Sequence, residues 1–177
     1  MNNSPGEQMV LAMKSILKMQ SDSIKLFEDL DKSMPGLESF YRNVVTLGLG
    51  NSMSSRHYLA EGLIRLYFRP GNKTDFLGIN ICFYDLNDPK FIEPILVAAR
   101  IVYEPVAVDQ SEKIKRGWDP WYAFLSWIPE RMYGQPITIK RPKRREAIEE
   151  ITVAATPLFA ITNLESALAL IDLVGRP

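Results

Sequence analysis

The chain has only one cysteine, Cys82, and only one histidine, His57, among its 177 residues. A single thiol cannot form an internal disulfide, and so few cysteines are typical of proteins from reducing compartments. Zinc sites need a cluster of cysteine and histidine ligands, which this sequence does not contain. We therefore expect neither a disulfide nor a bound metal, and we interpret Cys82 as a small apolar residue of a strand.

Net charge is also absent, because 21 lysines and arginines balance 21 aspartates and glutamates. A neutral chain has no long-range field to draw it to nucleic acid or to an anionic membrane. No apolar run approaches the roughly 18 residues of a membrane span, and Lys14 interrupts the first apolar stretch where a signal peptide would be continuous. The sequence predicts a soluble, cytoplasmic protein without a membrane partner.

Motifs for common enzyme chemistries are missing as well. There is no P-loop, no Gly-x-Ser-x-Gly turn and no Gly-x-Gly-x-x-Gly. Residues 88–90 spell the Asp-x-Lys triplet of some metal-dependent nucleases. A proline in the middle of a turn, however, would keep the acid and the lysine from projecting together from one strand face. We expect no cofactor, and the sequence identifies no catalytic residue.

The composition is that of one ordinary globular domain. Hydrophobic residues make up 46% of the chain and charged residues 24%, close to the averages of folded proteins. No repeat, low-complexity tract or linker divides the sequence. We predict a single domain over residues 1–177, with a helical layer (1–50), a three-stranded meander (51–104), an irregular aromatic and proline-rich cover (105–136), and a hairpin with a C-terminal helix (137–177).

Two helices are predicted in the first 50 residues. Ser4 is followed by a proline and, three positions later, by Glu7, which is the pattern of a capping box. Apolar residues then recur at helical spacing from Met9 to Leu30. A second helix is predicted over Pro35–Leu47. Methionines on the seam of the first helix adapt to varied partners, so we consider its pairing with a copy of itself or with another protein's helix. The alternative is that it packs on its own sheet.

After residue 51 the apolar period changes from 3.6 to 2, which indicates strands. We predict strands over His57–Phe68, Asp75–Asp85 and Ile92–Glu104, joined by turns short enough to make neighbours antiparallel. A second hairpin and a final helix follow. The predicted fold is α+β with two layers, an N-terminal helical pair packed on a mainly antiparallel sheet of about five strands, with a C-terminal helix.

Alternation divides the predicted strands into two faces. We assign Ile64, Ile79 and Val97 to one face, which is core. The opposite face mixes apolar and polar residues, so we interpret it as a pocket wall under the tryptophan-rich segment. The candidate ligand-binding residues are Arg65, Asn80, Tyr84, Arg100, Trp118 and Trp121. The alternative is a half-exposed face on which Glu61 neutralises Arg65 and Glu104 neutralises Arg100.

The strongest local charge bias lies between Glu112 and Arg145, a segment that contains nine lysines and arginines but only three acidic residues. The candidate nucleic-acid contacts at the predicted hairpin tip are Lys140, Arg141, Lys143, Arg144 and Arg145. Aromatic residues within 118–133 could stack on unpaired RNA bases while these cations bind phosphates. The alternative is a solvated turn that keeps a sheet edge soluble, because three glutamates follow within 146–150.

These observations leave three hypotheses. The leading one is a non-enzymatic binding or regulatory domain that engages a small molecule or a partner protein through the covered sheet face. The second is an RNA-binding protein that uses the hairpin at 140–145 with the aromatic segment 118–133. The third is an enzyme whose acid and base groups, such as Glu61, Glu104 or Tyr84, converge only in three dimensions. A homodimer through the N-terminal helix is compatible with the first hypothesis.

Overall fold

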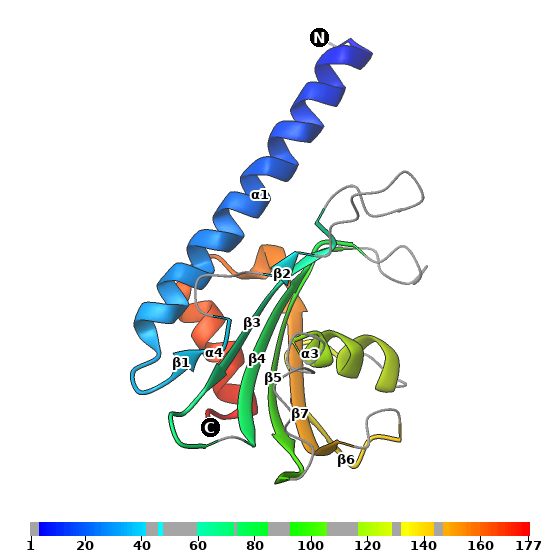
Figure 1. The fold of residues 1–177 in the computed structure, drawn as a ribbon. Helices are drawn as coiled ribbons and strands as arrows, with labels where there is room; N and C mark the ends of the chain where they lie inside the picture. Colours follow the sequence, from blue (N-terminus) through cyan, green and yellow to red (C-terminus); the bar gives the residue numbers. More distant parts are fainter. Residues whose placement is uncertain are drawn as a thin grey trace.

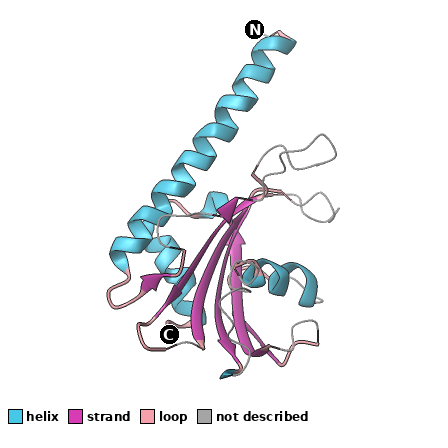
Figure 2. Cartoon of the chain, in the orientation of Figure 1, coloured by secondary structure: helices cyan, strands magenta, loops and turns pink. Residues whose placement is uncertain are grey.

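The arrangement of helices and strands comes from a computed structural model. It describes residues 4–41, 46–47, 60–72, 74–84, 93–105, 117–128, 132–143 and 147–177. In this part of the chain a long N-terminal helix and a C-terminal helix accompany one antiparallel sheet (Figure 1). Figure 2 shows these two helices on one side of the sheet and a short helix on the other. The predicted α+β class, the antiparallel sheet and the two terminal helices are therefore confirmed.

The described residues form seven strands and four helical segments. The helical segments are α1 (Pro5–Ser33), α3 (Asp119–Tyr122) with its π-helical continuation η3 (Ala123–Trp127), the 3₁₀ turn η4 (Leu158–Ala160), and α4 (Leu164–Val174). The strands are β1 (Glu38–Ser39), β2 (Thr46–Leu47), β3 (Gly62–Phe68), β4 (Asp75–Cys82), β5 (Ile95–Tyr103), β6 (Ile137–Lys140) and β7 (Ile148–Pro157). Their order is β1-β3-β4-β5-β7-β6, and β2 also pairs with β3.

The predicted second helix over Pro35–Leu47 is wrong. The chain turns at Gly36, which has a φ of 79°, and then forms β1 and later β2, both antiparallel to β3. The Phe40 amide adds a hydrogen bond of 2.7 Å to the Leu66 carbonyl. Without these partners β3 would have an unpaired edge. The hydrogen bonds gained by pairing this edge stabilise the strands more than the short helical periodicity stabilises a helix. The N-terminal layer therefore contains one helix instead of a pair.

One face of the sheet is covered by α1 and α4. Phe27 and Leu30 of α1 and Ile171 of α4 are at most 1% exposed and pack with Leu77 and Ile79 of β4. These α1 residues all belong to the C-terminal half of the helix. The N-terminal half extends past the sheet, as Figure 1 shows in dark blue.

The other face is covered by α3 and η3. Trp121 and Phe124 are buried there with apolar residues of β5 and β7. One close approach is at Gly78, where an added Cβ would lie 2.5 Å from Cγ of Pro120. Only glycine fits this contact, because any side chain would push the cover off the strand. Both faces of the sheet therefore carry a core.

The strand register corrects the faces that we assigned from alternation. Residues directly opposite each other in an antiparallel pair share a face, and Ile79 stands opposite both Arg65 and Ala98. Ile79 therefore lies on the helix-covered face, whereas Ile64 and Val97 lie on the face under α3. Alternation defines the two faces within one strand. Which face of a strand lies on the same side of the sheet as a given face of the neighbouring strand depends on the pairing register.

Candidate functional site

Arg65, the first candidate ligand-binding residue, faces α1. Its guanidinium pairs with Asp31 near the end of α1, with Nε donating to Oδ1 at 3.3 Å, and it is only 5% exposed. The Tyr67 hydroxyl donates to the same carboxylate oxygen at 2.7 Å. Burial, followed by the bond to Asp31, raises the pKa of Tyr67. The three side chains tie α1 to β3.

Asn80, Trp118 and Trp121 lie on the opposite face. Asn80 is fully buried, its Nδ2 donates to the Gly117 carbonyl at 2.7 Å, and its Oδ1 accepts from the Trp121 amide at 2.8 Å. The two indole rings are 4.9 Å apart. By satisfying backbone groups of the cover, Asn80 joins the cover to the sheet. These three residues form a junction separate from Arg65.

Arg100 and Tyr84 lie at opposite ends of the sheet. Arg100 makes two bonds to Asp75, of 3.1 and 2.7 Å, and the hydrogen bonding raises the pKa of Arg100. Tyr84 follows the end of β4, where burial and the charge of Glu61 raise its pKa. Glu104 follows β5, at the Arg100 end. The six candidate ligand-binding residues therefore do not meet in one cavity, and of the three candidate acid–base residues only Glu61 and Tyr84 lie together.

The basic hairpin contains an ion pair with an acidic residue and a backbone hydrogen bond between its two sides. Lys140 Nζ lies 3.7 Å from Glu150 Oε2, and the Arg141 amide donates to the Glu149 carbonyl at 2.8 Å. These four residues and Val102 line a hollow of about 330 Å³. Lys143 is exposed. Arg144, Arg145 and His57 lie outside the described residues. The RNA hypothesis therefore stays a prediction.

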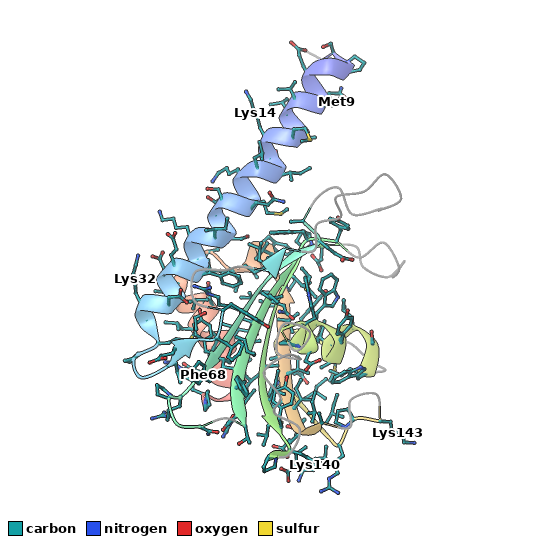
Figure 3. The ribbon with its side chains drawn as sticks, viewed as in Figure 1. Met9, Lys14, Lys32, Phe68, Lys140 and Lys143 are labelled. Atoms are coloured by element: carbon teal, nitrogen blue, oxygen red, sulfur yellow. The ribbon has the colours of Figure 1, made fainter. Side chains whose placement is uncertain are left out.

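A line of exposed apolar side chains runs along α1. We call this line, together with the half-buried polar residue that interrupts it, the exposed seam: Val10, Met13, Leu17, Gln20 and Ile24. Its members recur every three and four residues, and the apolar ones are 54%, 45%, 61% and 43% exposed in chain order. Figure 3 shows the part of α1 that carries Met9 and Lys14 extending away from the sheet. The seam begins on this projecting part and continues toward the sheet.

The exposed seam lies beside the line of α1 that packs on the sheet. Ser23 is 4% exposed, whereas its neighbour Ile24 is 43% exposed. Because an α-helix turns about 100° per residue, the seam stands roughly a quarter turn from the buried line. The five charged side chains between residues 5 and 25 all lie off the seam: Glu7, Lys14, Lys18, Asp22 and Lys25. The seam is thus free of charge.

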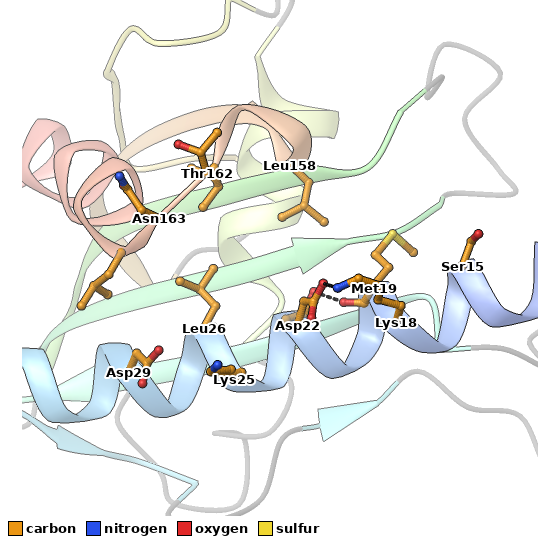
Figure 4. Close-up of a pocket in the computed structure, with 13 residues that line it drawn as sticks. Ser15, Lys18, Met19, Asp22, Lys25, Leu26, Asp29, Leu158, Thr162 and Asn163 are labelled. Carbon is orange, nitrogen blue, oxygen red and sulfur yellow. Dashed lines mark hydrogen bonds and ion pairs between the residues drawn. The ribbon is translucent and has the colours of Figure 1, made fainter.

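A groove borders the other side of α1, next to η4 and the start of α4 (Figure 4). Its volume is about 580 Å³. The apolar residues that line it are Met19, Leu26, Leu158, Ile161 and Leu164. Lys18 and Asp22, which pair at 2.6 Å, also line it. Clefts of this size with a mainly apolar lining are typical of small-ligand sites.

Sequence reasoning missed this groove because its walls come from opposite ends of the chain. The only available signal was that Met19 and Leu26 stand seven residues apart, off the main apolar line of α1 and on the side away from the seam. That spacing indicates a second contact surface but not its partner. The wall from η4 and α4 becomes apparent only in the folded chain.

Comparison of the chain with protein-family models, with curated proteins and with solved structures gave no match. Among the described residues, no three histidine, cysteine, aspartate or glutamate side chains are grouped so as to hold a metal ion. None of the helices described combines the length and the apolar composition that crossing a bilayer needs. Function is therefore inferred from the surfaces of the chain itself.

Proposed function

We propose that the protein is a binding domain that engages a partner protein through the exposed seam of α1. The supporting observation is the exposure of Val10, Met13, Leu17 and Ile24 along one line of the helix. Single exposed apolar residues are ordinary on protein surfaces. A line of them at helical spacing is the pattern by which helices recognise partners. The proposal keeps the predicted class of function and moves the contact from the sheet to α1.

The helix is formed before any partner arrives. Ser4 and Glu7 close a capping box, with the Ser4 amide donating to the Glu7 carboxylate at 2.7 Å, and Asp31 holds the other end on β3. Binding therefore does not have to nucleate the helix. Covering the four half-exposed apolar side chains of the seam contributes on the order of 4 kcal/mol. That is a substantial share of the binding free energy of a micromolar complex.

A photoreactive side chain tests this proposal. With p-benzoylphenylalanine in place of Leu17, irradiation in extracts of the cells that make the protein is expected to yield a discrete protein adduct. Leu11 provides the matched control, because it is also exposed, at 50%, but lies on the charged side of the same helix. Adducts identified by mass spectrometry should come from position 17 and not from position 11. Equal labelling at both positions, or none at either, would contradict the proposal.

A second candidate function is the binding of a small apolar molecule in the groove between α1 and α4. The observation that favours it is the volume of about 580 Å³ with a mainly apolar lining surface. An apolar fluorescent dye provides the probe. Met19→Trp fills the groove and is expected to reduce dye binding, whereas Met9→Trp makes the same change outside the groove. Equal dye binding by the two variants would exclude this candidate.

A further inference from the structure

We infer that the partner of the exposed seam is a second copy of this chain, so that two α1 helices pair along Val10, Met13, Leu17 and Ile24. This inference rests on the proposed function and names its partner. The spacing of these residues, three and four in alternation with Gln20 included, is the spacing of a two-stranded coiled coil. An exposed seam with that spacing fits an identical seam, because side chains of one helix fill the gaps of the other.

The charge distribution favours a second copy over a partner selected by charge. Glu7, Lys14 and Lys18 on the projecting part all lie off the exposed seam, so two copies meet without bringing like charges together. The seam equally offers no charge that a partner of opposite sign could recognise. Its one polar member is Gln20, and a single polar residue in a self-pairing seam serves to fix the register of the two helices. Isologous pairing of this kind is the commonest form of oligomer.

The described part of the domain covers a different side of α1 from the seam. It covers the side of α1 that bears Ser23 and Phe27, which are 4% and 1% exposed, while Ile24 is still 43% exposed beside them. The apolar side chains of the seam are therefore solvent-accessible up to the point where α1 packs on the sheet. From Val10 to Ile24 the seam is about 21 Å long, at 1.5 Å per residue. A pair this short is marginal between free peptides, but here each helix is already anchored in a folded domain.

The mass of the full chain in solution tests the inference. The protein is expected to reversibly form a dimer of twice its 20.2 kDa mass in sedimentation equilibrium and native mass spectrometry. Leu17→Glu is expected to raise the dissociation constant more than about tenfold, because it places a carboxylate on both sides of the pair. Leu11→Glu makes the same change on the charged side of the helix and should leave the dimer intact. Unchanged circular dichroism in both variants would show that the fold is preserved.

A monomer at the highest attainable concentration, or a dimer that Leu17→Glu and Leu11→Glu weaken equally, would overturn the inference. The photo-cross-linking experiment distinguishes a failure of this inference from a failure of the proposed function. An adduct from position 17 to a different protein would show that the seam binds a partner other than itself. The absence of any adduct from position 17 would contradict both this inference and the proposed function. A disulfide formed by Leu17→Cys, but not by Leu11→Cys, adds independent support, since the native Cys82 is fully buried.

Discussion

The two halves of α1 have the same apolar periodicity but different surroundings. In the C-terminal half, Phe27 and Leu30 are at most 1% exposed against the sheet, whereas in the N-terminal half Met9 is 71% and Leu17 is 61% exposed. Helical spacing of apolar residues therefore predicts a helix with an apolar face. It does not predict which part of the chain, or which partner, packs on that face. Four predictions, from the largest expected effect to the smallest, test this difference.

The largest contrast is in packing. Leu30→Ala should lower the free energy of unfolding by about 3 kcal/mol, because it leaves a cavity between α1 and the sheet. Leu11→Ala, the same change on the projecting half, should alter it by less than about 0.5 kcal/mol. Urea denaturation of both variants measures the difference. Similar losses would mean that the N-terminal half also packs on the domain.

A buried and an exposed ion pair of α1 give the next contrast. Asp31→Asn removes a carboxylate charge that pairs with Arg65, whose side chain is 6% exposed, so we expect the free energy of unfolding to fall by about 3 kcal/mol. Asp22→Asn breaks the pair with Lys18, whose side chain is 75% exposed, and should cost less than about 0.5 kcal/mol. Denaturation midpoints of the two variants at neutral pH provide the measurement. An equal effect would contradict the anchoring role of Asp31.

Alkaline pH should act on the anchored half. Because the pKa of Tyr67 is raised in the folded state by burial and by Asp31, the folded protein retains a proton that the unfolded chain releases above about pH 10. Stability is therefore expected to fall as the pH rises past that value. Tyr67→Phe should cost about 1 kcal/mol at neutral pH through the lost hydrogen bond and should reduce the alkaline slope. An unchanged slope would exclude Tyr67 as its source.

The smallest global effect is expected at the N-cap. Ser4→Ala removes the side chain that accepts from the Glu7 amide at 3.3 Å, which costs about 1 kcal/mol of local helix stability. Because the projecting half packs little on the domain, the global free energy of unfolding should change by less than about 0.5 kcal/mol. Hydrogen exchange should accelerate in the first turns of α1 alone. Faster exchange at Phe27 would show that the halves unfold together.

The sequence predicted those features that local chemistry determines. The capping box at Ser4 starts α1 as expected, and period-two alternation identified β3, β4 and β5. It did not predict features that depend on distant pairing. The run after Pro35 has helical spacing but pairs with β3, and the face of Ile79 follows from its neighbours in the sheet. Arg65 and Asn80, which we singled out as candidate ligand-binding residues, have their partners, Asp31 and Gly117, more than 30 positions away in the chain.

The projecting half of α1 also affects how the molecule moves through a solvent. A helix of 29 residues is about 44 Å long, and a compact domain of this size has a radius of gyration of roughly 16 Å. Such a rod increases friction well beyond that of a sphere of equal mass. Gel filtration would therefore overstate the mass of a single chain, which is why the oligomeric state is better read from equilibrium sedimentation than from an elution volume.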